Sequence, residues 1–222
     1  MDNDPQPRIA ILGAGPIGLE AALYARYLGY SAEVFERAKL PAQQVHDAGE
    51  RMLEGPFRDH ASTLGVAALV AQDSEWQCPA GSARLSAAEY HQHYLKPLAE
   101  SDLIAESLRL EMEVLSVERT KEDAWQIYCL GSRERRSEFT ADCIVDTTGA
   151  GSKDFVEDDG QATEQLSFLN PTADYFVLGS KSSKSGEEFR FAKGLAQICE
   201  LFAILGERED LDIYATMPPI AG

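Results

Sequence analysis

The chain contains 222 residues, 44% of them apolar, which is enough for one large domain or one domain with a small addition. Its formal net charge of −17 argues against binding nucleic acid or an anionic membrane through the overall electrostatic field. No apolar run approaches the roughly 20 residues of a membrane span, and the opening MDNDPQPR lacks the features of a signal peptide. We therefore expect a cytoplasmic protein with no nucleic-acid or membrane partner.

The chain is predicted to begin with a strand, a glycine-rich turn, a helix and a second strand. The apolar run IAIL suits a strand buried on both faces of a parallel sheet. The hexapeptide GAGPIG follows at once and fits the pattern GxGxxG, and Gly29 is expected to end the helix. The four elements occupy residues 9–12, 13–18, 19–28 and 31–35. This order is typical of a dinucleotide-binding unit, the alternative being a glycine-rich turn in an unrelated α/β domain.

Each residue type in this stretch has a physical reason to be there. Gly13 permits the tight turn, Gly15 leaves the backbone free to approach a pyrophosphate, and Gly18 lets the helix lie close to the strand. Glu36 lies 23 residues after Gly13, where a carboxylate can accept hydrogen bonds from ribose hydroxyls. The same carboxylate would repel a 2′-phosphate, so NADP is disfavoured, although the neighbouring Arg37 leaves that alternative open.

Residues 39–65 contain three glycines and two prolines and show little periodicity. They predict a mostly irregular excursion with a short helix, and long loops of this kind are often functional. Arg51 is the candidate here, because an arginine in such a loop can reach a phosphate. The alternative is an ordinary solvated arginine.

The tetrapeptide SAAE at 86–89 fits a capping box and predicts a helix after it. In that helix Tyr90 and Tyr94 lie four residues apart and share a face, whereas His91 and His93 do not. This argues against a helical pair of histidine ligands, and no other group has metal-ligand spacing, so no metal is predicted.

The four cysteines are scattered and include no CxxC. We expect reduced thiols that mostly pack in the interior, as in cytosolic proteins. A catalytic thiol pair would require two of them to meet in the fold. They are Cys78, Cys129, Cys143 and Cys199.

The second half of the chain predicts successive strands with polar turns, then a buried strand and a long helix. The strands are expected at 111–119, 125–130, 137–139, 143–146 and 175–179, and the helix at 187–205. The small residues TTGAG at 147–151 allow close backbone approach at the carboxyl end of a buried strand. The segment SKSSKSG at 180–186 consists of small and basic residues and is predicted to be a flexible loop. It is either an anion-binding site before the helix or an ordinary linker.

Together these segments resemble the two-dinucleotide-domain flavoproteins, which include flavin-containing monooxygenases and thioredoxin-reductase-like enzymes. The segments are GAGPIG with Glu36, HYLKPLAESDLI at 93–104, MEVLSVER at 112–119, CIVDTTGAG at 143–151 and DYFVLGSKS at 174–182. GAGPIG is the specific part, and the others are similar by their order. The resemblance covers most of the chain and implies an α/β, Rossmann-like FAD/NAD(P)-binding domain: a parallel sheet flanked by helices plus a β-meander.

The resemblance also implies that the first motif binds FAD, with NAD as the alternative. The three motif glycines would face the pyrophosphate, Glu36 would bind the adenosine ribose, and Arg51 is a candidate phosphate ligand. Val114 would lie beside the adenine, and residues 148–149 would pass near the FAD. The predicted cofactor-binding residues are Gly13, Gly15, Pro16, Ile17, Gly18, Glu36, Arg37, Arg51, Val114, Thr148 and Gly149.

The chain departs from the family pattern in two places. The family inserts an NAD(P)H domain with its own GxGxxG after the first TG strand, whereas here residues 152–173 link the two parts, too few for a βαβ unit of roughly 30 residues. Ser180 stands where many members have an acidic residue. We therefore expect one FAD/NAD(P)-binding domain over residues 1–222, with parts 1–151 and 174–206 joined by this short link.

Three functions fit this sequence. The first is an FAD-dependent oxidoreductase, monooxygenase-like or reductase-like, reduced by NAD(P)H docking directly or by a protein reductase. The second is a non-catalytic module that binds FAD or NAD. The third is a scaffold or partner subunit that binds nothing tightly. No catalytic residue is predicted, because no nucleophile or general base has a sequence signature.

Overall fold

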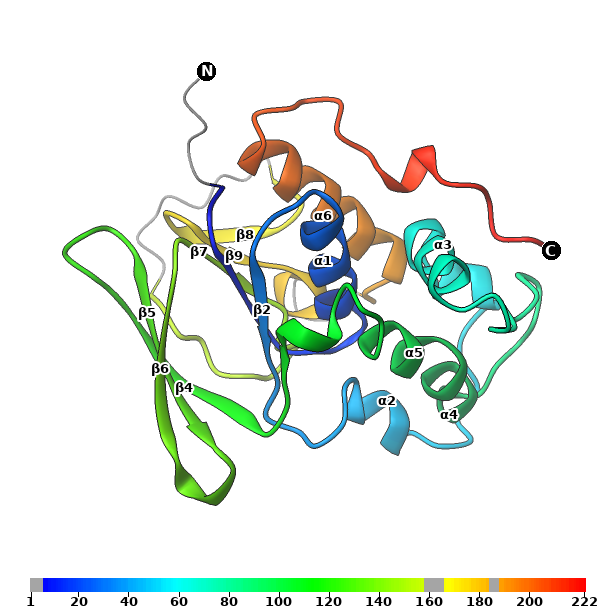
Figure 1. Cartoon of the computed structure of the whole chain (residues 1–222), viewed down its shortest axis with the longest axis horizontal. Coiled ribbons are helices and arrows are strands. Elements are labelled where there is room, and N and C mark those ends of the chain that lie inside the picture. The colour runs from blue at the N-terminus through cyan, green and yellow to red at the C-terminus, as the bar shows by residue number, and fades with distance from the viewer. Residues whose placement is uncertain (1–5, 158–165, 184–187) are drawn as a thin grey trace.

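The computed structural model describes residues 6–157, 166–183 and 188–222, which form two sheets and a layer of helices (Figure 1). The larger sheet has the strand order β3-β2-β1-β7-β9-β8. All of its neighbours pair in parallel except the edge strand β8, which runs antiparallel to β9. Its strands are β1 (Ile9–Leu12), β2 (Ala32–Phe35), β3 (Leu108–Arg109), β7 (Cys143–Asp146), β8 (Leu169–Thr172) and β9 (Tyr175–Val177).

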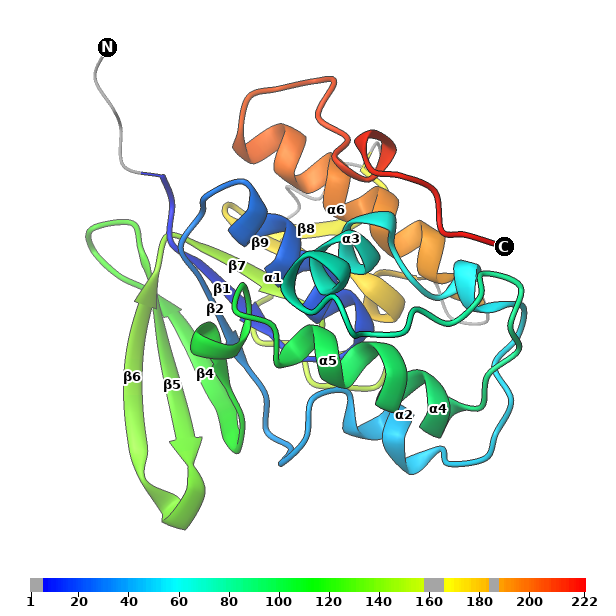
Figure 2. The same ribbon diagram turned by 45° about the vertical axis from the view of Figure 1, so that its right-hand side comes forward.

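The second sheet is an antiparallel meander that packs on one face of the larger sheet, with the helices on the other face (Figure 2). Alternation along β1 follows from this sandwich, because Ile9 and Ile11 pack toward the helices while Ala10 and Leu12 pack toward the meander. The apolar run IAIL is therefore buried on both faces, as predicted. The meander strands are β4 (Met112–Arg119), β5 (Trp125–Gly131) and β6 (Arg136–Ala141).

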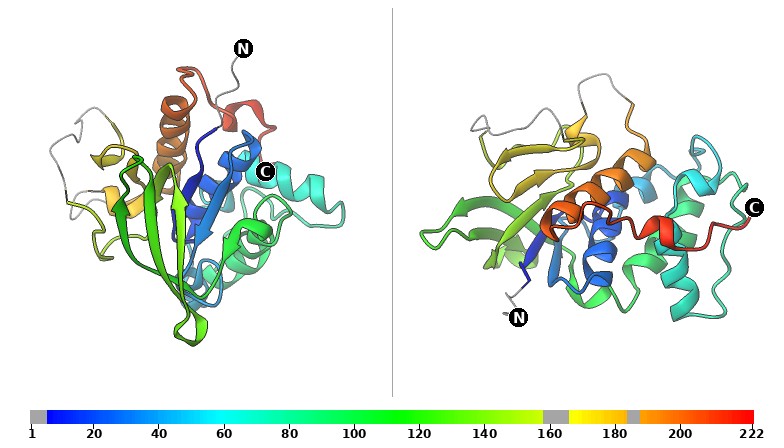
Figure 3. Two further views of the ribbon diagram at one scale, coloured as in Figure 1. Left: turned by 60° about the vertical axis from the view of Figure 1, so that its left-hand side comes forward. Right: turned by 90° about the horizontal axis from the view of Figure 1, so that it is seen from above.

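Helices α1 and α6 lie against each other on the larger sheet, and α3, α4 and α5 pack outside α1 (Figure 3). Close approach of α1 and α6 depends on Gly194, where an added Cβ would lie 2.2 Å from Cδ1 of Ile17. The helices are α1 (Pro16–Tyr27), α2 (Gln43–Asp47), α3 (Thr63–Gln72), α4 (Ala87–Tyr90), α5 (Lys96–Ala99) and α6 (Phe191–Leu205).

The predicted capping box is confirmed, with Ser86 and Glu89 each accepting a hydrogen bond from the other's backbone N–H. The helix then continues through a π-helical turn at His91–Leu95, which periodicity did not indicate. Tyr90 and Tyr94 are both buried and stacked, as their spacing predicts. Cys129 and Cys143 are buried, and all four cysteines are free.

Several elements differ from the sequence-based expectation. The helix predicted at 187–205 begins only at Phe191. Residues 188–190 are not helical, and Arg190 has an extended backbone. The short edge strands β3 and β8, and helix α3, were not predicted; β8 contains Pro171, which is tolerated at a sheet edge. The prediction of a flexible loop at 180–186 does not describe its first residues. Gly179–Ser182 form a 3-10 turn in which the Lys181 side chain is buried, and residues 184–186 lie outside the described ranges.

Candidate functional site

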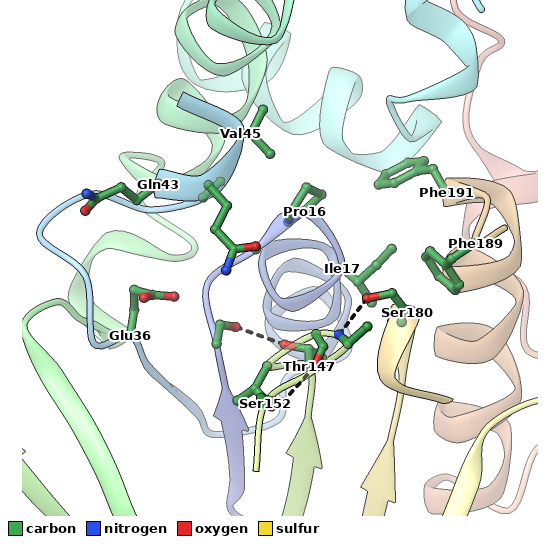
Figure 4. A pocket seen from close by; sticks show the side chains of 18 of the residues that line it. Pro16, Ile17, Glu36, Gln43, Val45, Thr147, Ser152, Ser180, Phe189 and Phe191 are labelled. Atoms are coloured by element: carbon green, nitrogen blue, oxygen red, sulfur yellow. Dashed lines mark hydrogen bonds between the residues drawn. The ribbon is translucent and has the colours of Figure 1, made fainter. Parts of the chain in front are cut away.

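A cavity of about 1410 Å³ lies where β1, β2, β7 and β9 end, at the carboxyl edge of the parallel sheet (Figure 4). Cavities for a single small ligand usually measure about 300–1,000 Å³, so this one has room for a large or extended molecule. The carboxyl edge of an open parallel sheet is where ligands bind in α/β folds, since the loops that follow the strands converge there. The described chain thus has a pocket where its topology places one.

The glycine turn forms one wall of this cavity. Gly13 has φ +96°, and a Cβ on it would lie 3.1 Å from the carbonyl oxygen of Thr147. A Cβ on Gly18 would lie 2.0 Å from the carbonyl oxygen of Gly13, so α1 can approach β1 only because Gly18 has no side chain. A Cβ on Gly15, by contrast, would have nothing within 4 Å, and Gly15 lines the cavity. Gly15 thus leaves open space at the start of α1.

The N-terminus of α1 faces this space without a side-chain cap. Gly15 is the N-cap residue and Pro16 follows in the first turn, so no side chain of the cap accepts from the helix N–H groups. Uncapped N–H groups and the positive end of the helix dipole attract anions. The absence of side chains and the dipole both fit a phosphate group at this position.

Glu36, at the end of β2, borders the same cavity. Its Oε2 accepts from the backbone N–H of Ala14 at 2.8 Å, and its Oε1 accepts from the N–H of Ala38 at 2.8 Å. These two bonds fix the carboxylate beside the glycine turn. Each oxygen keeps a further lone pair, so the carboxylate can still accept from hydroxyl groups of a bound sugar.

The opposite wall comes from the loop after β7 and the turn after β9. Oγ1 of Thr147 donates to the carbonyl oxygens of Leu12 and Gly13 at 2.9 and 3.0 Å, which joins this wall to the glycine turn. The N–H of Ala150 donates to Oγ of Ser180 at 3.1 Å. Residues 147–153 and 179–180 therefore present mostly backbone and small side chains to the cavity.

The cavity has chemically different ends. Glu36 and Gln43 lie on one side of Pro16, whereas Phe189 and Phe191 lie on the other, before and at the start of α6 (Figure 4). The helix predicted at 187–205 would include Phe189, but this residue lies before the helix, where it lines the cavity as well as packing on the core. The polar end suits a sugar, and the aromatic end suits a planar ring.

Two titratable groups on the cavity lining have raised pKa values. Burial, with a smaller contribution from Glu20, raises the pKa of Tyr90 well above its usual range, and its hydroxyl donates to the carbonyl oxygen of His60. A hydrogen bond with Glu54 raises the pKa of Glu188. Both shifts favour the protonated form of these groups.

The predicted cofactor-binding residues are brought together with two exceptions. Gly18 lies behind the turn instead of on the cavity surface, and Arg51 is exposed and outside the cavity lining. The carbonyl of Arg51 accepts from the N–H of Ala87, which holds its backbone toward α4. The predicted residues that line the cavity are Gly13, Gly15, Pro16, Ile17, Glu36, Arg37, Val114, Thr148 and Gly149.

Within the described ranges, no three His, Cys, Asp or Glu side chains are grouped so that they could hold a metal ion. None of the helices in those ranges is both long and apolar enough to cross a membrane.

One family model matches part of the chain. The model of the pyridine nucleotide-disulphide oxidoreductase family matches residues 8–69, which contain the glycine turn and Glu36. No curated protein sequence matches the chain.

Several solved structures are similar in fold. OTEMO in complex with FAD and NADP is 16% identical with a TM-score of 0.51, and the match covers 70% of this chain and 28% of that one. An FAD-bound form of OTEMO is 16% identical with a TM-score of 0.50, over 70% of this chain and 28% of that one. Oxidized steroid monooxygenase bound to NADP is 20% identical with a TM-score of 0.49, over 64% and 26%.

The Rossmann-like fold class is confirmed. The predicted resemblance to two-dinucleotide-domain flavoproteins is confirmed as a likeness of fold, and the chain spans about 28% of the OTEMO chains that it matches.

Proposed function

We propose that this protein binds FAD in the cavity at the carboxyl edge of the sheet, as the cofactor-binding part of an oxidoreductase. The observation that carries the proposal is the open space at Gly15, in front of the uncapped start of α1, with the Glu36 carboxylate beside it. A backbone without side chains, a helix N-terminus and a sugar-binding carboxylate are the three parts that a dinucleotide requires.

The residues present fit FAD along the whole cavity. The glycine turn would hold the pyrophosphate, Glu36 the adenosine ribose, and Val114 the adenine face. Phe189 and Phe191 supply an aromatic surface at the far end, where a second ring system would pack. When bound, FAD would supply hydride and electron transfer, and this chain would supply binding, orientation and the electrostatic environment.

Residues 1–222 are proposed to form one nucleotide-binding unit, in which the link 152–173 takes the place of an inserted domain. Support comes from β7 and β9, which flank that link and pair directly and in parallel. A nicotinamide cofactor would then reach the flavin by docking over it, or a protein reductase would supply the electrons.

A non-catalytic module that binds FAD or NAD is the second candidate. The same link favours it, because residues 152–173 are too few for a second nucleotide-binding βαβ unit. Both functions use the glycine turn and Glu36 in the same way, and they differ in whether the aromatic end of the cavity receives a flavin.

The test is to purify the protein, record its absorbance spectrum and measure thermal unfolding with FAD, NAD, ADP-ribose or ATP. Ligand at a hundred times its Kd stabilises the folded state by about 2.7 kcal/mol, which a melting experiment resolves. Flavin absorbance, or a larger shift with FAD than with ADP-ribose, is the expected result. Equal shifts with FAD, NAD and ADP-ribose would favour the non-catalytic module, and no shift with any of them would overturn both functions.

A further inference from the structure

The wall opposite the glycine turn contains a buried ion pair that the proposed function does not use. Nζ of Lys181 lies 2.7 Å from Oδ2 of Asp146, and the two side chains are 8% and 0% exposed. Removing two charges from water costs several kcal/mol for each ion, so a buried pair is weak support for stability by itself.

Asp146 organises the turn after β7. Its Oδ1 accepts from the backbone N–H of Thr148 at 3.0 Å and from Oγ1 of Thr148 at 2.6 Å. Its Oδ2 accepts from the Tyr175 hydroxyl at 2.9 Å as well as from Lys181. The carboxylate thus accepts four hydrogen bonds, and two of them fix Thr148, which lines the cavity.

Lys181 extends the same network along the loop. Its ammonium donates to the carbonyl oxygen of Lys153 at 2.6 Å and lies 3.4 Å from Oδ1 of Asp154. The Lys153 ammonium in turn donates to the carbonyl oxygen of Leu115, next to the cavity residue Val114 on β4. One buried ammonium thus connects the turn after β9, the loop after β7 and, through Lys153, the meander.

We propose that Lys181 is a positioning residue for the dinucleotide: it pins loop 148–155 to Asp146 so that this loop completes the cavity wall. The inference rests on the proposed function. Lys181 does not itself line the cavity, whereas residues 148–153 and Phe155 do. Lys181 would therefore affect the ligand through the backbone that it holds and through the Phe155 ring, whose centroid lies 5.6 Å from its ammonium.

The test distinguishes a role of Lys181 in positioning loop 148–155 from a role in the stability of the fold. K181M alone leaves the buried Asp146 charge unpaired and is expected to unfold, so the informative variant is D146N/K181M, which removes both charges. The asparagine amide can still accept from Thr148, but nothing reaches the carbonyl of Lys153. D146N/K181Q replaces this variant if it fails to fold, K181R is the conservative variant, and K121M removes an exposed lysine of the β4–β5 turn as the matched control.

Affinity for FAD and for ADP-ribose is measured by titration of each folded variant, with hydrogen exchange of peptides spanning 148–155. We expect the double variant to bind at least tenfold more weakly and to exchange faster in this loop, while K181R stays within about threefold of wild type and K121M is unchanged. A folded double variant with wild-type affinity would overturn the inference and leave the proposed function standing. A wild-type protein that binds neither ligand would overturn the proposed function, and this inference with it.

Discussion

The two walls of the cavity are built in different ways. The glycine wall, residues 13–18, lies within one strand–turn–helix unit and depends on side chains that are absent, since a Cβ at Gly18 would lie 2.0 Å from a carbonyl oxygen. The wall at 146–155 and 179–182, which we call the ion-pair wall, depends on side chains that are present, with Lys181 and Asp146 in contact across 35 residues of sequence. One wall is local and made of backbone; the other is assembled from distant segments.

This difference determines how each wall responds to substitution. In the glycine wall an added methyl group has no space at Gly18 but free space at Gly15, three residues earlier. In the ion-pair wall a single substitution leaves a buried partner unpaired, so only paired substitutions are informative. The glycine wall should therefore be tested by adding atoms and the ion-pair wall by removing matched charges.

The largest effect is expected from Gly18→Ala. In an ordinary helix interior this change would add about 1 kcal/mol of stability, but the new Cβ would lie 2.0 Å from the Gly13 carbonyl oxygen and 2.6 Å from Oγ1 of Thr147. We expect a net loss of about 3 kcal/mol in the free energy of unfolding, measured with chemical denaturant. Gly15→Ala is the matched control, with a loss below about 1 kcal/mol, and equal losses in the two variants would contradict the close packing at Gly18.

Gly15→Val should leave the fold intact and remove the ligand. The valine side chain would enter the open space in front of α1, and the extended backbone at this residue, φ −71° and ψ 179°, accepts a branched side chain. We expect affinity for FAD and ADP-ribose to fall at least 100-fold, about 2.7 kcal/mol, by fluorescence titration. Wild-type affinity in a folded Gly15→Val protein would place the phosphates elsewhere.

The glycine wall could be predicted from the sequence because its information is local. GAGPIG after an apolar run specifies the strand, turn and helix, and the capping box at Ser86 specifies a helix start by the same short-range logic. The order of the later strands followed from alternation and polar turns. Burial of β1 on both faces then followed from the parallel sheet.

The ion pair of the second wall could not be predicted, because no local pattern marks it, although the small residues 147–151 did predict where the backbone of this wall lies. Lys181 sits in a serine-rich basic stretch that is typical of a solvated loop, and Asp146 ends an apolar strand like many others. Their pairing depends on the parallel register of β7 and β9, which places Asp146 beside Val177. The helix start was also predicted too early, because residues with helical spacing, including Phe189, occur before Phe191, where the helix begins.

Glu20 on α1 is a buried carboxyl whose donor is a neutral hydroxyl, whereas Asp146 is paired with an ammonium. It is fully buried, and its Oε1 accepts from the Tyr94 hydroxyl at 2.6 Å. Burial raises the pKa of Glu20 from 4.5 to about 7, against the opposing effect of its hydrogen bonds. The folded protein therefore holds this proton more tightly than the unfolded chain does.

The sign of the pH dependence follows from that raised pKa. The contribution of Glu20 to stability is complete below about pH 4.5 and is lost as the pH rises through about 7. Glu20→Gln keeps the shape without the charge, so we expect it to be more stable than wild type by about 3 kcal/mol at pH 8.5 and by less than about 1 kcal/mol at pH 5. Denaturant unfolding at both pH values is the measurement, and the same difference at both would rule out titration of Glu20 in this range.

The smallest effect is expected at the edge of the glycine wall, from Glu36→Gln. The amide oxygen can keep one backbone donor, at Ala14 or Ala38, but the charge and one acceptor are lost. Affinity for NAD or FAD should fall about tenfold, or about 1.4 kcal/mol, which is the size expected for a charged hydrogen bond.

Affinity for NADP should change in the opposite direction, because the carboxylate that repels a 2′-phosphate is gone while the exposed Arg37 remains beside it. The ratio of NADP to NAD affinity is therefore the sharper measurement, since a general loosening of the glycine wall would weaken both ligands together. A ratio that stays constant would mean that Glu36 supports the turn through its backbone bonds and does not contact the ribose.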